Sequence, residues 1–454
     1  MTTRRLWALG LLAVLTLPAV TTRIYASDEV QYFAFVRSLA FDRDLSFENE
    51  YQYFFEHDAG GEGFHATFLE DRYTQAGRRI NFGTIGPALL WAPFYAVGHI
   101  VAGVTGAPQD GYSQPYITAV AYGSAVYGWL AIFLSAAIAH RWMARGRGAA
   151  LAVMIGTPLL FYVYVAPPFS HACATFAVTL SLWVWLRVRE TWSPAGIILL
   201  GLTVGLMATM RDQAGLFAIG PALDFARWAW RRRQWRPTAI RAAVGAAAAL
   251  AAFLPQLLAS RAINGYIGPH ESVGNKMSWM SPHAFSVLLN PEHGWFVWTP
   301  LAVLGLAGLV GLALGRIRAD PRPELSHDAR WFGVCALVMI GLQVYINGAV
   351  ESWTVAGAFG QRRFLEVTPL LVVGLAAVLS SGRQPRRILW GIVVLSVWWN
   401  LGLLIQFGTH RMDRQRLTLR DNAWQTFVVL PRDAPALAWQ YLTDRSSFYR
   451  QPRQ

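Results

Sequence analysis

Residues 388–407 read ILWGIVVLSVWWNLGLLIQF, a run of 20 residues without one charged side chain. As an α-helix such a run extends about 30 Å, which matches the hydrocarbon core of a bilayer. Arg386 and Arg387 stand directly before the run, where membrane helices often carry positive charge. The run therefore predicts a helix that crosses a membrane.

Other apolar runs occur along the whole chain. They are residues 6–22, 84–105, 114–140, 148–166, 170–186, 194–210, 214–230, 239–259, 296–315, 331–350 and 364–380. Hydrophobic residues make up 54% of the chain and charged residues 14%, whereas roughly a quarter of a soluble domain is charged. The 20 Trp and 16 Tyr also suit a membrane protein, because both rings favour the headgroup region. We expect an all-α polytopic membrane protein.

The net charge of +13 does not indicate a nucleic-acid partner. Arginine supplies nearly all of the positive charge, since Lys276 is the only lysine. The arginines stand mainly in short loops between apolar runs, whereas a nucleic-acid binder gathers them on one soluble face. We therefore expect membrane lipid, and no nucleic acid, around this chain.

The arginines also predict which loops share a side of the membrane, because loops rich in arginine stay on the cytoplasmic side. If 84–105 does not cross, the N-terminus and the arginine-rich loops share one side; these loops are 141–147, 187–193, 227–241, 316–330 and 381–387. If 84–105 does cross, every later loop changes side, and the arginine-rich loops would lie outside. Pro87 and Pro93 also disfavour a straight spanning helix there. We expect a re-entrant or interfacial helix at 84–105 and about eleven spanning helices elsewhere.

This topology divides the chain into a membrane domain and a tail. The expected parts are a transmembrane domain at 1–407, with a first outer loop at 23–113 and a second at 260–295, and an outer C-terminal tail at 408–454. The first run resembles a signal peptide, but Ile24 makes a poor cleavage site near Ala26. We interpret it as an uncleaved membrane helix.

Asp28 and Glu29 stand directly after the first membrane helix. Ser27 is a suitable N-cap, and the apolar residues that follow predict a helix lying along the outer surface. Two carboxylates in its first turn complement the helix dipole and need no further function. Carboxylates at a headgroup boundary are costly, however, so a functional role is an equally open interpretation.

The Asp-Glu pair in a long outer loop resembles the hallmark of the glycosyltransferase C superfamily. The chain is most similar to its family 39-like branch, which holds the protein O-mannosyltransferases and lipid A aminoarabinose transferases. Three further stretches resemble motifs of this branch: FGTIGPALLWAPFYAVG at 82–98, NPEHGWFVWTPLAVLG at 290–305 and WTVAGAFGQRRF at 353–364. The resemblance extends from about residue 20 to 405, and the tail matches no motif of the branch.

This resemblance implies a multi-pass enzyme of the inner (plasma) membrane. Such enzymes move a sugar from a polyprenyl-phosphate donor to an envelope glycan, lipid or protein acceptor on the non-cytoplasmic face. Asp28 would accept the proton of the acceptor hydroxyl. Glu29, adjacent in a helix, would point elsewhere and support a neighbouring group. Nothing in the sequence requires a metal or a cofactor.

Cations in the outer loops are candidates for holding the donor phosphate. They are Arg362, Arg363, Arg211 and Lys276. A guanidinium can bind phosphate bidentately, but an arginine at this depth also commonly extends toward the headgroups without binding anything. For Arg211, an ion pair with Asp212 is the alternative, and for Lys276 a solvated loop charge.

Three further polar residues are candidates for contacting the acceptor or supporting the site. They are His171, Glu271 and Glu351. Each also has an ordinary structural explanation, as a residue at the end of a helix or in a solvated loop.

Two other functions remain open. A transporter or flippase of a lipid-linked glycan should show repeated halves and polar residues at mid-membrane, and neither is evident in the sequence. A membrane scaffold without chemistry would tolerate the loss of Asp28, whereas a transferase would not.

Overall fold

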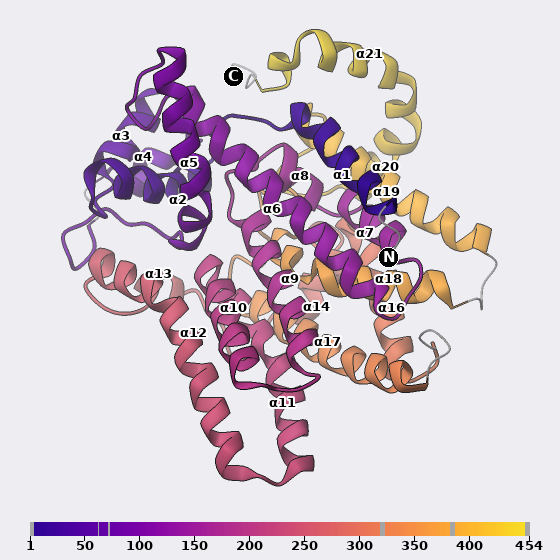
Figure 1. Ribbon diagram of the computed structural model, residues 1–454. Coiled ribbons are helices and arrows are strands. Elements are labelled where there is room, and N and C mark those ends of the chain that lie inside the picture. Colours follow the sequence, from indigo (N-terminus) through magenta and orange to yellow (C-terminus); the bar gives the residue numbers. More distant parts are fainter. Residues whose placement is uncertain (1–3, 62, 71–72, 318–322, 382–385, 450–454) are drawn as a thin grey trace.

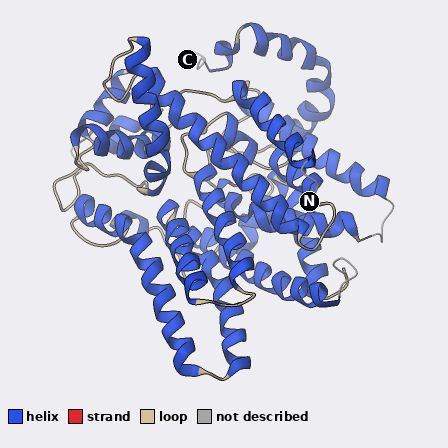
Figure 2. Cartoon of the chain, in the orientation of Figure 1, coloured by secondary structure: helices blue, strands red, loops and turns tan. Residues whose placement is uncertain are grey.

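The computed structural model describes residues 4–61, 63–70, 73–317, 323–381 and 386–449. Within these ranges every named element is a helix or a helical turn, and none is a strand (Figure 2). The predicted all-α class is therefore confirmed. The predicted inner loops 316–330 and 381–387 lie partly outside the described residues. The first three residues of the chain and the last five of the tail lie wholly outside them.

Seven helical stretches of the described residues are long and apolar enough to cross a membrane. They belong to α5 (Gly86–Thr105), α6 (Gln114–His140), α9 (His171–Val188), α12 (Trp235–Asn264), α17 (Pro323–Ala349), α18 (Thr368–Ser380) and α19 (Arg386–Gly408). Shorter apolar helices are α1 (Arg4–Thr16), α7 (Gly146–Ile155), α10 (Pro194–Met210) and α16 (Leu301–Ala313). The polytopic architecture is confirmed, and the number of about eleven spans stays a prediction.

Two predicted apolar runs fold differently from a single straight helix. The run 148–166 divides into α7, which ends at the C-cap Gly156, and α8 (Leu159–Tyr164), because Pro158 has no backbone N–H to continue the first helix. The run 214–230 begins as a 3₁₀ turn and continues as α11 (Ile219–Arg232). Charged residues on α11 give it a polar face, which the hydrophobic count alone did not reveal.

The first long loop forms a packed unit of short helices at one end of the bundle, called here the loop end (Figure 1). It contains α2 (Ser27–Arg37), α3 (Glu48–Glu56) and α4 (Phe64–Phe68) beside α5. Phe33 of α2 is fully buried and meets Phe54 of α3 and Tyr95 of α5 edge to face, with ring centroids 5.6 and 5.9 Å away. These contacts fix α2 against the bundle.

Helix α5 forms an antiparallel hairpin with the first half of α6. The Trp91 indole N–H donates to Ser124 Oγ over 2.8 Å, and His99 Nδ1 lies 2.6 Å from the hydroxyl of Tyr116. The start of α5 packs closely against the end of α10. A Cβ added at Gly86 would lie only 2.3 Å from the Thr209 carbonyl, so only glycine fits there. By length and composition α5 could itself cross a membrane, so its interfacial placement stays a prediction.

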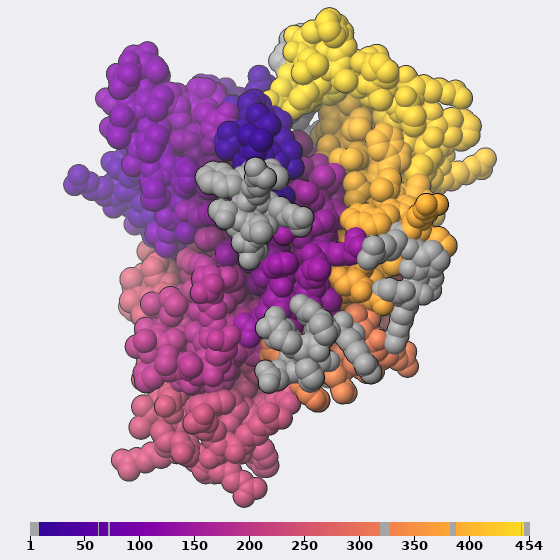
Figure 3. Space-filling model, turned by 45° about the vertical axis from the view of Figure 1, so that its right-hand side comes forward, coloured from indigo at the N-terminus to yellow at the C-terminus, as the bar shows by residue number. Residues whose placement is uncertain are grey.

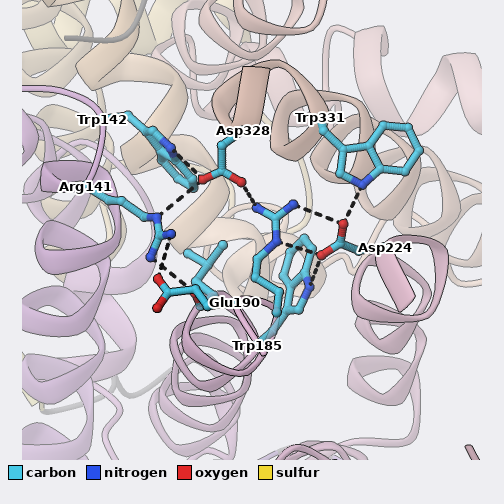
Figure 4. Close-up of polar contacts among 9 residues, drawn as sticks. Arg141, Trp142, Trp185, Glu190, Asp224, Asp328 and Trp331 are labelled. Atoms are coloured by element: carbon cyan, nitrogen blue, oxygen red, sulfur yellow. Dashed lines mark hydrogen bonds and ion pairs between the residues drawn. The ribbon is translucent and has the colours of Figure 1, made fainter. Parts of the chain in front are cut away.

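The opposite end of the bundle is joined by a buried carboxylate on α11 (Figure 4). Asp224 accepts two hydrogen bonds from the Arg189 guanidinium, at 2.6 and 3.0 Å. It also accepts the indole N–H groups of Trp185 and Trp331, at 3.0 and 2.8 Å. One carboxylate thereby joins α9, α11 and α17.

Asp328 extends this network toward α6. It contacts Arg189 through one oxygen and accepts the Trp142 indole N–H over 3.1 Å through the other. Arg141 lies 3.4 Å from Asp328 and 2.9 Å from Glu190. We call these side chains, together with Asp224, Trp185 and Trp331, the Arg189 network. Predicted loops 141–147, 187–193 and 316–330 therefore meet at one end of the bundle.

Candidate active site

Asp28 pairs with Arg362 at the loop end. Asp28 lies in the first turn of α2, and Arg362 begins the 3₁₀ turn η4 (Arg362–Val367) that leads into α18. Asp28 Oδ2 lies 2.7 Å from Arg362 Nη1, and the two side chains are 35% and 24% exposed. The guanidinium of Arg362 also lies over the ring of Phe169, 5.3 Å from its centroid. The pair is thus held by the fold and remains accessible to a ligand.

Glu29 points away from this pair and caps the start of α2. Its Oε2 accepts the backbone N–H groups of Tyr25 and Ala26, at 2.9 and 3.0 Å. This carboxylate satisfies two amides where the linker from α1 turns into the helix. Burial raises the pKa of Glu29 to about 8. Glu29 therefore supports Asp28 by fixing where the helix begins.

Arg211 forms a second ion pair deeper in the site. Its Nη1 lies 3.3 Å from Glu366 Oε1 and 2.5 Å from His171 Nδ1. His171 Nδ1 is in turn 3.7 Å from Glu366 Oε1. The ends of α9 and α10 thereby meet the turn η4. The structure joins Arg211 to Glu366 instead of the neighbouring Asp212.

Glu366 was missed in the sequence, although a signal was present. The residue stands inside the apolar run 364–380, and a carboxylate at such a position commonly has a partner or a function. Its side chain is 1% exposed. Among the described groups, neither of its oxygens has a hydrogen-bond partner, so the Arg211 charge is its main compensation.

Arg363 is held through its backbone and one side-chain contact. Its carbonyl accepts the side-chain amides of Gln213 and Asn347, at 3.1 and 3.3 Å, and its Nη2 donates to Ser352 over 3.1 Å. In the described part of the chain, no carboxylate forms an ion pair with Arg363. Three arginines therefore face two carboxylates here, which leaves a local excess of positive charge.

Two tyrosines complete the site, and neither was singled out from the sequence. Tyr32 stands one turn after Asp28 on α2, and burial raises its pKa above the usual value. The ring of Tyr162 lies 4.6 Å from that of His171, and its hydroxyl donates to the Phe359 carbonyl over 3.3 Å. Tyr162 lies in the apolar run 148–166, and Tyr32 lies in the surface helix expected after Ser27. Aromatic residues are common in both settings, so neither position gave a specific signal.

Lys276, Glu271 and Glu351 lie apart from this cluster. All three are exposed, and the Glu351 backbone N–H donates to the Lys276 carbonyl over 2.8 Å. No ion pair among the described residues joins them to Asp28 or to the arginines. Of the predicted site residues, the structure thus assembles Asp28, Arg362, Arg363, Arg211 and His171, with Glu29 behind them.

No protein-family model matches this chain, and no curated relative matches it. Solved structures do match over nearly its whole length. ArnT from Cupriavidus metallidurans bound to undecaprenyl phosphate superposes with a TM-score of 0.52 at 14% identity, covering 97% of this chain and 73% of that one. ArnT of the same organism in the apo state gives a TM-score of 0.48 at 14% identity, covering 93% and 74%. This chain therefore has the all-helical, polytopic fold of ArnT, as the resemblance of its motifs to the glycosyltransferase C superfamily predicted.

Proposed function

We propose that this chain is a membrane glycosyltransferase that moves a sugar from a polyprenyl-phosphate donor to an acceptor hydroxyl. The observation that carries the proposal is the 2.7 Å contact between Asp28 and Arg362. It joins a carboxylate suited to proton transfer with a cation suited to phosphate. The shared fold supports the same function, since ArnT has been solved bound to undecaprenyl phosphate.

Arg362 binds the donor phosphate in this proposal. A guanidinium presents two parallel N–H groups that match phosphate oxygens, and Arg211 and Arg363 add positive charge nearby. Because phosphate and Asp28 compete for the same guanidinium, donor binding loosens the ion pair. The freed carboxylate then stands beside the sugar that the phosphate carries.

Asp28 acts as the general base. The acceptor oxygen attacks the anomeric carbon while the bond from that carbon to the phosphate oxygen breaks. The phosphate leaves with the bonding electron pair, and Asp28 takes the hydroxyl proton. The products are a glycosylated acceptor and a polyprenyl phosphate. Since phosphate is already a good leaving group, a second carboxylic acid is not needed.

The reaction takes place on the non-cytoplasmic face of the inner membrane. Three of the arginine-rich loops (141–147, 187–193 and 316–330) support this placement, because they meet at the end of the bundle opposite to Asp28. The acceptor belongs to the cell envelope. Lys276, Glu271 and Glu351 remain candidates for contacting it from the second outer loop and the end of α17.

The test compares envelope glycans by mass spectrometry in cells with wild-type protein, a deletion, and Asp28→Asn at equal protein level. The proposal expects the deletion and Asp28→Asn to lose the same fixed sugar mass. Asp421→Asn makes the same substitution at an exposed position of α20 (Leu419–Trp424) and should keep that mass. If the deletion changes the envelope and Asp28→Asn does not, transport of a lipid-linked glycan becomes the better explanation.

A further inference from the structure

Helices α11 and α12 form a hairpin that projects from the end of the bundle opposite to the loop end (Figure 1). In Figure 3 the same hairpin forms the lowest part of the molecule. Its turn and the flanking helix ends, residues 227–241, are called here the hairpin tip. Between Asp224 and Glu271 the sequence has no acidic residue. The hairpin tip carries six arginines: Arg227, Arg231, Arg232, Arg233, Arg236 and Arg241.

The carboxylate that precedes the hairpin tip is already engaged by another arginine. Asp224 is buried and accepts two hydrogen bonds from Arg189, at 2.6 and 3.0 Å. Among the described residues, no ion pair joins a carboxylate to any arginine of 231–241. The positive charge of the hairpin tip is therefore available to an anion from outside the chain.

Two arginines of the hairpin tip share one indole ring. The Cζ atom of Arg232 lies 5.3 Å from the ring centroid of Trp228, and the Cζ atom of Arg241 lies 5.6 Å from it. A cation–π contact stabilises a guanidinium but leaves its N–H groups free to donate hydrogen bonds. Two like charges around one ring also repel each other. An anion that accepts from both guanidinium groups removes this repulsion.

Two buried polar groups of α12 also indicate an acceptor from outside the chain. Thr238 is 7% exposed, and neither its hydroxyl nor Arg241 Nε has a hydrogen-bond partner among the described groups. Residues three apart in a helix lie on the same face, and buried polar groups are normally hydrogen-bonded. The start of α12 adds backbone N–H groups, because the side chain of Gln234 does not cap them, and the helix dipole there favours an anion.

The length of α12 and two exposed tryptophans place the hairpin tip at the depth of lipid headgroups. A helix of 30 residues is about 45 Å long, whereas the hydrocarbon core of a bilayer is about 30 Å thick. Trp230 and Trp235 are 70% and 59% exposed and meet edge to face, with ring centroids 6.0 Å apart. Tryptophan favours the headgroup layer, and the anion of that layer is the phosphate of a phospholipid.

We propose that the hairpin tip binds the headgroup phosphate of an anionic phospholipid. Arg232 and Arg241 donate hydrogen bonds to the phosphate beside Trp228, and the Thr238 hydroxyl donates another. The bound lipid connects the end of α11 to the start of α12, and α11 carries Asp224 into the Arg189 network. The inference is independent of the proposed function, because no step of sugar transfer takes place at this end of the bundle.

The test measures binding of phosphatidylglycerol to the purified full-length chain by native mass spectrometry. Arg241→Gln should weaken this binding by about tenfold, because a hydrogen bond to a charged phosphate commonly contributes a factor of this size. Thr238→Val keeps the size and the charge of the site and should weaken binding by about threefold. Arg316→Gln removes the same charge at an exposed arginine of the predicted inner loop 316–330 and should bind like wild type. Phosphatidylethanolamine, which has no net charge, should bind wild type more weakly than phosphatidylglycerol.

Four results would overturn the inference. In the first, Thr238→Val binds phosphatidylglycerol as tightly as wild type, a comparison that holds even where Arg241→Gln does not fold. In the second, Arg316→Gln loses as much affinity as Arg241→Gln, or phosphatidylethanolamine binds as tightly as phosphatidylglycerol, so that the lipid has no defined site. In the third, inorganic phosphate displaces the lipid at equal concentration, which would make the tip a site for a free anion. In the fourth, a single-stranded oligonucleotide displaces it, which would make the tip a nucleic-acid surface.

Discussion

Asp28 and Arg362 come from the first loop and from the start of η4, yet their charged atoms lie 2.7 Å apart. Neither residue is near the other in sequence, so the contact depends on the folding of the whole bundle. Because both side chains remain partly exposed, an anionic ligand can compete for the guanidinium. This competition makes binding and turnover separable by mutation.

Asp28→Asn should abolish turnover and strengthen phosphate binding. The substitution removes the proton acceptor and also the anion that competes for Arg362. A partly exposed ion pair contributes about 0.2–1 kcal/mol, so undecaprenyl phosphate should bind about 1.4- to fivefold more tightly. Isothermal titration and a turnover assay measure the two effects on one preparation. Weaker binding in Asp28→Asn would show that the carboxylate helps to hold the ligand.

Arg362→Lys should weaken undecaprenyl phosphate binding by about tenfold, although the charge is kept. Lysine offers a point charge, whereas the guanidinium offers two parallel N–H groups to a phosphate. The same titration measures this loss. Arg416→Lys, at a mostly exposed arginine of the tail, provides the matched control. Equal affinities for wild type and Arg362→Lys would remove Arg362 from the phosphate site.

Glu29 should make the protein less stable as pH rises. Its pKa is about 8 in the folded protein against the usual 4.5, so the folded state holds a proton that the unfolded state has lost. Stability from this group is fully present below pH 4.5 and declines as pH rises toward 8, by at most about 1.4 kcal/mol per pH unit. Burial raises the pKa of Glu50 to about 7, which adds a slope of the same sign.

Glu29→Gln isolates the contribution of Glu29, because the amide oxygen still accepts the two backbone N–H groups. The difference in thermal midpoint between Glu29→Gln and wild type should grow between pH 5 and 8, in favour of the variant. Glu56→Gln makes the same substitution at an exposed position of α3 and serves as the matched control. A constant difference for Glu29→Gln would mean that the carboxyl is ionised throughout.

Glu366→Gln should destabilise the fold by about 3–5 kcal/mol, because it leaves the Arg211 charge uncompensated in a buried place. The double variant Glu366→Gln with Arg211→Gln should recover part of this loss. Denaturation of the two single variants and the double variant measures the coupling between the pair. Additive effects would show that the 3.3 Å contact contributes no stability.

Trp331→Phe should reduce stability without changing turnover at low temperature. The change removes one hydrogen bond to Asp224, a loss of about 1 kcal/mol, at the end of the bundle opposite to Asp28. Thermal unfolding and a turnover assay at a temperature where both proteins are folded measure the two quantities. A loss of turnover in the folded variant would show that the two ends of the bundle are coupled.

Much of the fold could be predicted from the sequence, because lipid as a solvent requires long apolar runs. The all-α polytopic class follows from these runs and is confirmed. The break at Gly156 and Pro158 was not predicted, since hydropathy continues across it even though the helix does not. The charged face of α11 escaped the same count, because Asp224 and Arg227 lie within a run that is apolar on average.

The site could be predicted in part. The position of Asp28 after the first membrane helix and the arginines of the 353–364 motif identified the two sides of the Asp28–Arg362 pair. Their contact was not predictable, because it depends on how α2 packs against the bundle. Glu366 and Tyr162 lie in apolar runs, and only the fold reveals that both face His171.

The Arg189 network makes one end of the bundle more rigid than the other. Its hydrogen bonds and ion pairs hold α11 together with the adjoining ends of α6, α9 and α17 (Figure 4). We therefore expect movements that admit a bulky acceptor to occur away from this network. Amide hydrogen exchange should be slower in the turns that flank Arg189 than in α21 (Leu430–Thr443), where only Leu430 is buried.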